Sequence, residues 1–475
     1  MKIAFLHYHL KPGGVSTVIR QQMAALSGRA EMLLLTGAPP DEAVSVPAAV
    51  ISGIGYDSPD GPAGSLDERP EQTADQIIQA IHGHWPNGCD ILHVHNPLLA
   101  KNARLPDILR HLQAKGIRLL LQVHDFAEDG RPDAYYSRAS YPADCHYCVI
   151  NARDEAYLRS AGLAEKGLHR LPNMVNPFDF TSEKKFDQNY VLYPVRAIRR
   201  KNLGEAVLLS LFFAPHTRLA VTLPPNSPRD KRPYQSWLAF AEKNRLPVLF
   251  EASRRYNFQD LVQSADCLIT TSITEGFGFA FLEPWTAGQF LTGRKLPDIC
   301  RDFEENGLRL DHLYEQLTVP LAVFDEKRFF QKWRACIQKR AEQYGIPMPE
   351  ATIRKGYQQL TDTGWIDFGL LDEIFQQQVI EKAAADPQLC QAIREQNPAA
   401  LAEPAPNDRS ERIANNRQAV RTAYNETAYR RRLLDVYEKT AAVEVSHAID
   451  KTRLALCFLR PETFSLLKWG EYDIH

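Results

Sequence analysis

This sequence of 475 residues contains little cysteine and no large excess of positive or negative charge. Its eight cysteines are too few for the disulfide framework of a secreted protein of this length. The 56 Lys and Arg residues oppose 58 Asp and Glu residues, for a net charge of −2. A net charge so close to zero argues against the basic surface that nucleic-acid-binding proteins need, so no nucleic-acid partner is expected. The hydrophobic content of 44% is nevertheless ample for large cores.

Long apolar runs are also missing. The longest, Ala206–Leu209 followed by Leu211–Ala214, falls short of the roughly 18–20 residues that cross a bilayer. The first residues lack the long apolar centre and the small-residue cleavage site of a signal peptide. We expect a soluble, cytoplasmic protein without a transmembrane segment. Peripheral membrane contact stays open, and the sequence does not determine the oligomeric state.

Several cofactor and metal motifs are absent. There is no GxGxxG, which disfavours a nicotinamide-dependent dehydrogenase, and no two aspartates stand two residues apart to form a D-x-D metal motif. His93 and His95 lack a third ligand at a convincing spacing. Cys145 and Cys148 have no second pair, so we interpret them as core cysteines. We therefore expect neither a metal nor a cofactor.

The first 170 residues alternate short apolar runs with amphipathic stretches, which favours a parallel sheet covered by helices. Gly37–Pro70, rich in Pro, Gly and Asp, is predicted to be a surface loop. A helix is expected over Val15–Ser27. The predicted strands are Lys2–Tyr8, Glu31–Leu35, Ile91–Val94, Arg118–Val123, Cys148–Ile150 and Leu168–Leu171.

The same rhythm restarts after Pro172–Lys185, a predicted linker. The second series has predicted strands at Tyr190–Pro194, Arg218–Leu223, Val248–Phe250 and Cys267–Thr271, with helices over Leu203–Phe213 and from Phe279. After Gly307 the chain becomes helical. Helices are predicted over Glu326–Tyr344, Leu371–Ala385 and Ala414–Ala442, with a loop over Asn397–Arg412.

Residues that could bind a ligand follow the ends of several predicted strands. In open parallel sheets, ligands bind outside the carboxyl ends of the strands. Gly13 and Gly14 follow the first strand, where a close backbone approach and a helix N-terminus suit a phosphate, although an ordinary turn explains them as well. His124 follows the strand LLLQV and can bond a polar substrate or serve only as a cap.

A basic turn follows the strand VLYPV. Four cations at a helix N-terminus oppose the helix dipole, and this becomes sensible if a polyanion such as a diphosphate fills the space. A solvated basic turn is the alternative. The four are Arg196, Arg199, Arg200 and Lys201.

The most specific pattern is EGFGFAFLE. Glu275 lies in the loop after the strand CLITT, and Glu283 is expected about one turn into the next helix. Gly276 and Gly278 permit a tight turn between them. Carboxylates at this spacing can both face one ligand, and each suits a pair of sugar hydroxyls.

This Glu-x7-Glu pattern resembles the signature of retaining glycosyltransferases of family 4, which have the GT-B fold. The turn GGV, the His124-Asp125 pair, PNMVNP before the linker and R-x4-K at Arg196 and Lys201 follow in that family's order. The resemblance covers about residues 1–300. It implies transfer of a hexose from a nucleotide diphosphate sugar to a hydroxyl acceptor, with retention and without a metal.

The resemblance also implies roles for individual residues. Gly13 and Gly14 would lie near the donor diphosphate, and His124 beside the 6-hydroxyl of the transferred sugar. Arg196 and Lys201 would bind the diphosphate and stabilise the leaving group. The residues that it assigns to the donor hexose and ribose are Glu275, Gly276, Phe277, Gly278 and Glu283.

The sequence departs from the family at Thr292–Pro297, where a Gly-Gly loop is usual and Arg294 and Lys295 stand instead. We hypothesise that one of these two cations meets an anionic group on the donor or the acceptor. The alternative is a solvated loop.

The predicted fold class is α/β: two doubly wound, Rossmann-like domains facing across a cleft, with a helical C-terminal extension. The expected domains are 1–180 on the acceptor side, 186–345 for the nucleotide sugar, and 346–475 as the extension, part of it packing on the first domain. The expected donor is UDP- or GDP-linked. Three alternatives stay open: a nucleotide-sugar epimerase, a phosphorylase, or a catalytically silent scaffold subunit.

Overall fold

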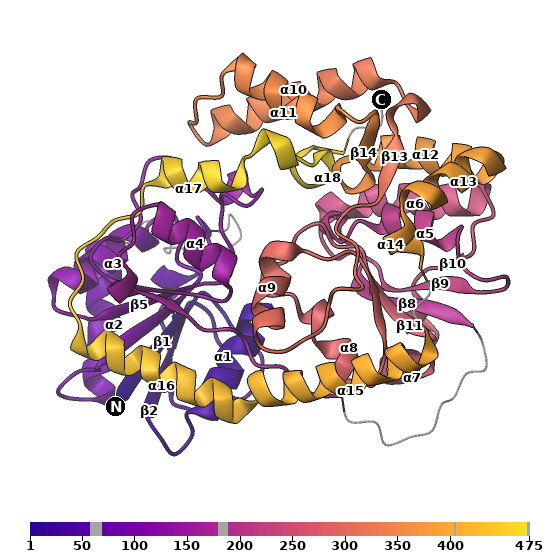
Figure 1. Cartoon of the computed structure of the whole chain (residues 1–475). Helices are drawn as coiled ribbons and strands as arrows, with labels where there is room; N and C mark the ends of the chain where they lie inside the picture. The colour runs from indigo at the N-terminus through magenta and orange to yellow at the C-terminus, as the bar shows by residue number, and fades with distance from the viewer. Residues whose placement is uncertain (58–68, 179–188, 403–404, 473–475) are drawn as a thin grey trace. The chain divides into compact units, whose positions relative to one another are not determined.

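A computed structural model describes residues 1–57, 69–178, 189–402 and 405–472. The chain divides into two compact units (Figure 1). Unit 1 contains Met1–Met174, Gln343–Ile346 and Tyr424–Phe458. Unit 2 contains Val175–Glu342, Pro347–Ala423 and Leu459–His475. The residues expected to form an extension are thus shared between the units, and the linker predicted over Pro172–Lys185 lies outside the described residues from 179 onward.

Unit 1 is built on a parallel sheet whose described strands follow the order β3-β2-β1-β4-β5-β6-β7. From β1 the chain proceeds outward in one direction to β3 and then in the other direction from β4 to β7. Right-handed crossovers then place the connecting helices on opposite faces. The carboxyl ends of β1 and β4 form the topological switch point, where such sheets bind ligands. The strands are β1 Lys2–His7, β2 Glu31–Thr36, β3 Ala48–Val50, β4 Ile91–His95, β5 Leu119–Val123, β6 His146–Val149 and β7 Leu168–Arg170.

Amphipathic helices cover this sheet. In α3, Ile108, Leu109 and Leu112 are buried while Arg110 is exposed, which is the pattern of a helix with one face on a core. Helix α16 comes from the far end of the sequence and packs against α1 within the unit 1 core (Figure 1). The helices are α1 Gly14–Ala25, α2 Pro70–His84, α3 Leu105–Ala114, α4 Ala152–Ser160, α16 Glu426–Ala442 and α17 Lys451–Phe458.

Unit 2 has a second parallel sheet of the order β10-β9-β8-β11-β12. Its switch point lies between the carboxyl ends of β8 and β11, the two neighbouring strands from which the chain proceeds in opposite directions. A short antiparallel pair, β13 and β14, is separate from this sheet. The strands are β8 Tyr190–Arg196, β9 Arg218–Leu223, β10 Val248–Leu249, β11 Cys267–Thr270, β12 Leu291–Gly293, β13 Thr318–Pro320 and β14 Trp365–Asp367.

The helices of unit 2, together with α16 of unit 1, correct two predictions. The helix expected over Ala414–Ala442 is two helices, because Asn425 accepts a hydrogen bond from the Ala428 N–H and caps a new helix. Much of the loop expected over Asn397–Arg412 is helical. The helices are α5 Leu203–Ser210, α6 Pro228–Lys243, α7 Phe258–Ser264, α8 Glu283–Thr286, α9 Pro297–Glu305, α10 Glu326–Gln343, α11 Glu350–Thr361, α12 Glu373–Ala385, α13 Pro387–Gln396, α14 Pro398–Leu401, α15 Pro406–Ala423 and α18 Leu466–Trp469.

Most predicted strands agree with the structure to within two residues. Strand β3 was not predicted because it is three residues at a sheet edge, inside the Pro- and Gly-rich stretch Gly37–Pro70. Cys145 and Cys148 are buried and unbridged, which confirms them as core cysteines. None of the described helices combines the length and apolar composition that a bilayer crossing requires.

Candidate active site

Two oppositely charged side chains meet at the switch point of unit 2. Lys201 follows β8 and Glu275 follows β11, and these strands are neighbours in the sheet. The Lys201 ammonium donates a hydrogen bond to the Glu275 carboxylate. Their side chains are only 16% and 8% exposed, so water screens the pair weakly. The structure thus brings together two residues that are 74 positions apart in the sequence.

The two carboxyl groups of the Glu-x7-Glu pattern lie in different electrostatic settings. Burial alone would raise the pKa of Glu275, but the charges of Lys201 and Arg200 and hydrogen bonds from Lys201 and Ser272 hold it below its usual range. Burial raises the pKa of Glu283 to about 7, and Lys201 only partly opposes this. Glu275 is therefore ionised at neutral pH, whereas Glu283 is near its midpoint.

Glu283 is the first residue of α8, not a residue one turn inside a helix. The helix predicted from Phe279 is divided into a short 3-10 turn over Phe279–Phe281 and the four residues of α8. Leu282 separates the two segments, and Pro284 supplies no N–H for a preceding turn.

The backbone that carries Lys201 is held on several sides. The Tyr193 hydroxyl donates to the Lys201 carbonyl. The Thr271 hydroxyl lies 3.1 Å from the same carbonyl oxygen and 2.9 Å from that of Asn202. Asn202 has φ 52°, in the left-handed region that non-glycine residues seldom adopt. The backbone of Lys201 is therefore fixed by the fold around it, and its ammonium is held by Glu275.

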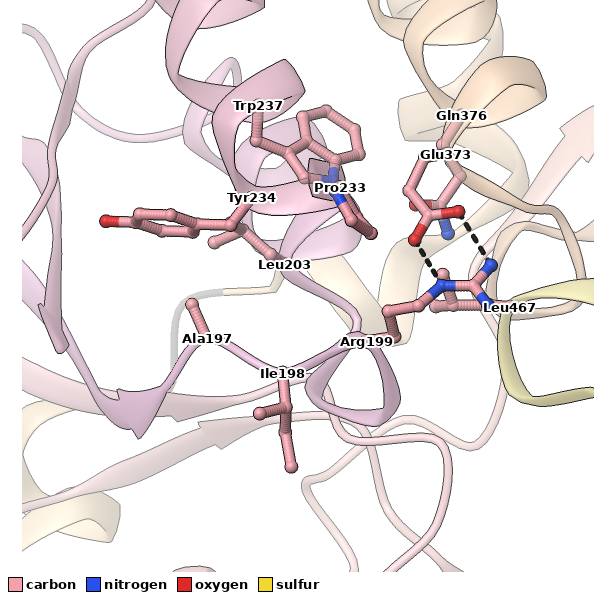
Figure 2. A pocket seen from close by; sticks show the side chains of 10 residues that line it. All are labelled: Ala197, Ile198, Arg199, Leu203, Pro233, Tyr234, Trp237, Glu373, Gln376 and Leu467. Atoms are coloured by element: carbon pink, nitrogen blue, oxygen red, sulfur yellow. Dashed lines mark hydrogen bonds and ion pairs between the residues drawn. The ribbon is translucent and has the colours of Figure 1, made fainter. Parts of the chain in front are cut away.

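The four cations of the basic turn do not act as one group. Arg196 is exposed, and its guanidinium donates to the Pro224 carbonyl at 3.1 Å. Arg199 instead lies inside the unit, with two bonds to Glu373 at 2.6 and 2.8 Å (Figure 2). Arg199 is thus a structural residue that ties the turn to α12, contrary to the expectation that all four cations face a polyanion.

The loop between the two glutamates is shaped by its glycines and by an aromatic contact. Gly278 has φ 97°, and a Cβ there would lie 3.0 Å from the Ile299 side chain. Phe277 is 5% exposed, and its ring packs edge-on against Phe303 with a centroid distance of 5.7 Å. The Phe277 ring therefore anchors the loop to the core of unit 2. Gly276 lies in the same loop.

Arg294 is buried among protein carboxylates. It lies directly after β12, is 4% exposed and forms ion pairs with Glu205 and Asp367, both at 2.6 Å. Lys295 pairs with Glu304 at 2.8 Å. The structure thus gives both cations partners within the chain. A single charged residue in the otherwise apolar helix segment LGEAVLLS was the available signal that Glu205 has a buried partner.

The glycine turn predicted at the first strand lies between β1 and α1 in unit 1. Gly13 has an extended backbone with φ 173°, and a Cβ at Gly14 would meet no atom of the described residues within 4 Å. Neither position therefore requires glycine for its own conformation or packing. Their lack of side chains leaves space beside the first turn of α1.

His124 lies at the carboxyl end of β5 and is 6% exposed. Its Nε2 lies 3.0 Å from Nδ1 of His95, and the two rings stack at 14°. The backbone N–H of His124 donates to the Asn96 side chain at 2.8 Å. Burial lowers the pKa of His124 to about 4, so its imidazole is neutral at physiological pH.

His95 and His93 continue this row of histidines. Their rings stack with a centroid distance of 4.4 Å, and His93 Nδ1 lies 2.9 Å from the Tyr437 hydroxyl. Burial lowers the pKa of His93 to about 3 and that of His95 well below its usual value. No cluster of three or more His, Cys, Asp or Glu side chains in the described parts of the chain has a metal-binding arrangement.

Comparison with known proteins gives one curated sequence relative and many structural neighbours. The mannosylglucosyl-3-phosphoglycerate synthase of Petrotoga mobilis is 28% identical over 406 aligned positions, and the similarity covers 77% of this chain and 78% of that protein. No family model matches the sequence.

The structural neighbours identify the fold. A glycosyltransferase from Rickettsia africae superimposes with a TM-score of 0.51 at 11% identity, over 93% of this chain and 98% of its own. The catalytic domain of starch synthase IV from Arabidopsis thaliana gives 0.50 at 11% identity, over 93% and 99%. The two-domain α/β GT-B fold expected from the sequence is confirmed. At these identities the structural neighbours show the fold of the chain and not its activity. Its assignment to family 4 and the residue roles implied by that assignment stay predictions.

Proposed function

We propose that the chain is a glycosyltransferase, which moves a hexose from a UDP- or GDP-linked sugar to a hydroxyl of a sugar-like acceptor, with retention and without a metal. The observation that supports this most is the arrangement of Lys201, Glu275 and Glu283 at the switch point of unit 2. A cation of fixed position beside two carboxyl groups suits a diphosphate flanked by the hydroxyls of a hexose and a ribose.

The proposed role of Lys201 and Arg196 is electrostatic stabilisation of the leaving group. As the glycosidic bond breaks, negative charge grows on the departing diphosphate, and cations already in place stabilise it without reorganisation. In the structure the Lys201 ammonium pairs with Glu275. Donor binding therefore offers the ammonium a second, doubly charged partner while Glu275 accepts hydrogen bonds from hexose hydroxyls.

Glu283 is proposed to hold the ribose. An ionised carboxylate can accept one hydrogen bond from each of two neighbouring hydroxyls. Because the pKa of Glu283 is raised to about 7, this role is sensitive to pH near neutrality. The shift of its pKa comes from burial and from the charge of Lys201, without a hydrogen bond from another described residue, as expected for a carboxyl group that awaits a ligand.

His124 is proposed to contact the 6-hydroxyl of the transferred sugar, with Gly13 and Gly14 near the diphosphate. The neutral imidazole of His124 bonds His95 through Nε2, which leaves Nδ1 for a hydroxyl. We assign no protein nucleophile and no general base. The family resemblance implies that the acceptor attacks the sugar from the same face from which the leaving group departs.

The acceptor is proposed to carry an anionic group. The name of the Petrotoga mobilis relative specifies a product that joins mannosyl, glucosyl and phosphoglycerate parts. We therefore propose phosphoglycerate glycosides as the first acceptors to test, with GDP-mannose and UDP-glucose as the first donors.

The experiment measures release of the nucleoside diphosphate in EDTA, with and without acceptor. We expect release of the nucleoside diphosphate only when the acceptor is present. We also expect a glycosylated acceptor in which the donor's anomeric configuration is kept. Conversion of the nucleotide sugar without any acceptor would indicate an epimerase instead. A reaction that depends strictly on inorganic phosphate would indicate a phosphorylase.

A further inference from the structure

Arg294 uses every hydrogen-bond donor of its guanidinium within unit 2. Its Nε and Nη2 donate to Glu205 at 2.8 and 2.6 Å, and its Nη1 and Nη2 donate to Asp367 at 2.8 and 2.6 Å. The second N–H of Nη1 reaches the Glu315 carbonyl at 2.9 Å. The guanidinium has five N–H groups, so none is left for an anionic ligand. Its function must therefore be exerted through its partners.

Glu205 connects Arg294 to Asn202 at the start of α5. Its Oε2 accepts a hydrogen bond from the Asn202 side chain at 2.7 Å, and its Oε1 accepts one from the Tyr314 hydroxyl at 2.6 Å. Glu205 is completely buried. A buried carboxylate is costly unless it is paired, and Arg294 is the cation that pairs it.

Asn202 is the residue next to Lys201, and its conformation is unusual. Its φ of 52° and ψ of 56° are left-handed, which costs about 1 kcal/mol for a residue with a Cβ. Its side chain is clamped at both ends: the amide nitrogen donates to Glu205, and the amide oxygen accepts from Gln376 at 2.8 Å. Gln376 lies beside Glu373 in Figure 2. The surrounding contacts, not local preference, impose this backbone at the lysine.

We propose that Arg294 is a positioning residue, which holds Lys201 at the diphosphate site through Glu205 and Asn202. The proposal rests on the function proposed above, in which Lys201 binds the diphosphate. The substitution Arg294→Lys keeps the charge but replaces arginine only in part, because a single ammonium cannot form bidentate pairs with two carboxylates at once.

The test is a double-mutant cycle between Arg294→Met and Lys201→Ala, read as the affinity for UDP and GDP by calorimetry in EDTA. For the nucleotide that the unmodified chain binds, Arg294→Met is expected to weaken affinity about 10-fold. In the Lys201→Ala background the same substitution is expected to weaken it less than about 2-fold, because the residue through which Arg294 acts is gone. Arg294→Lys should lie between Arg294→Met and the unmodified chain.

A matched control is Arg412→Met. Arg412 is also 4% exposed and pairs with two carboxylates of unit 2, those of Asp311 and Asp408, and within the described parts of the chain it forms no hydrogen bond or ion pair with the Lys201 turn. It should lose stability but keep the nucleotide affinity. If Arg294→Met does not fold, Tyr314→Phe removes one hydrogen bond from Glu205 more gently and is read in the same cycle.

The outcomes separate the two proposals. If Lys201→Ala weakens nucleotide binding and Arg294→Met weakens it equally in both backgrounds, or in neither, Arg294 does not act through Lys201 and only this proposal fails. If Lys201→Ala leaves the affinity unchanged, the diphosphate assignment of Lys201 fails, and the role of Arg294 fails with it.

Discussion

Glu275 and Glu283 carry the same chemical group in opposite electrostatic settings. The pKa of Glu275 is held below its usual range, because the attraction of Lys201 and Arg200 outweighs burial. That of Glu283 is raised to about 7, because burial outweighs the more limited attraction of Lys201. A raised carboxyl pKa costs stability when the group is ionised, and a ligand that donates hydrogen bonds to the carboxylate offsets that cost.

The first prediction concerns Glu283→Gln and pH. For wild type, nucleoside diphosphate affinity should fall as pH drops through about 7, because Glu283 takes up a proton and loses an acceptor. Glu283→Gln should bind more weakly at high pH and lack this part of the pH dependence. The ligand's own titration is common to both chains and cancels in their ratio, which calorimetry at several pH values gives. Parallel pH profiles would contradict the assignment of Glu283 to the ribose.

The stability of the same variant should change in the opposite sense. The folded state holds the Glu283 proton up to a pH of about 7, whereas the ordinary pKa of Glu is 4.5. The contribution of this group is therefore fully present below the unfolded pKa and is lost as pH rises through about 7. Above that pH, Glu283→Gln should be more stable than wild type by about 1–3 kcal/mol in chemical unfolding. Equal stabilities there would mean that the carboxyl group is not buried at a cost.

Some of these residue contacts could be predicted from the sequence and others could not, for a physical reason. Lys201 and Glu275 follow neighbouring parallel strands, so strand order alone brings them to one edge. The inward direction of Arg199 depends on Glu373, which is 174 positions away. Arg294 likewise depends on Asp367, on a short strand that no periodic pattern predicted. A cation in a turn looks the same in a sequence whether it faces solvent or a distant carboxylate.

At the scale of elements, short segments escaped prediction because they have no periodicity. Strands β12 and β14 have three residues each, and α8 has four. The two strands are positioned instead by pairing with a neighbour, β12 with β11 and β14 with β13. Gly293 at the end of β12 is the clearest case, since its φ is 116° and a Cβ would lie 2.0 Å from the Thr270 carbonyl oxygen.

Gly293→Ala should therefore disrupt the pairing of β12 with β11, which it joins opposite Thr270. We expect a loss of about 3 kcal/mol or more in the free energy of unfolding, measured with denaturant. Gly364→Ala is the matched control in the same unit: its φ is 75°, and nothing lies within 4 Å of the added Cβ. It should lose only about 1–2 kcal/mol. Similar losses for the two variants would show that the close approach at Gly293 is relieved cheaply.

At the scale of the whole molecule, each unit has its own sheet and its own part of the predicted site residues. Unit 1 is completed by a segment from the end of the sequence, since Leu433 and Val436 of α16 belong to its core. Inside that core, Gln22 donates hydrogen bonds of 2.8 Å to both Gln122 and the Tyr429 hydroxyl. The sequence predicted that part of the C-terminal extension packs on the first domain, but it did not predict that α16 is a helix separate from α15.

Tyr429→Phe should destabilise unit 1 by about 1–2 kcal/mol, because it leaves a buried Gln22 donor without its partner. The donor residues assigned to unit 2 should be unaffected. Chemical unfolding and calorimetric nucleotide titration of the same variant check both statements. A loss of nucleotide affinity that matches the loss of stability would contradict the assignment of the main diphosphate and ribose contacts to Lys201 and Glu283 of unit 2.

The most direct test of the proposed donor site is titration of the purified protein with UDP, GDP and ADP in EDTA, repeated with Lys201→Ala and Glu283→Ala. We predict that one nucleotide binds without a metal and that each variant weakens it at least about 10-fold, the loss of a charge-assisted contact. Binding of none of the three, or full affinity in both variants, would contradict the assignment of the diphosphate and ribose to these residues.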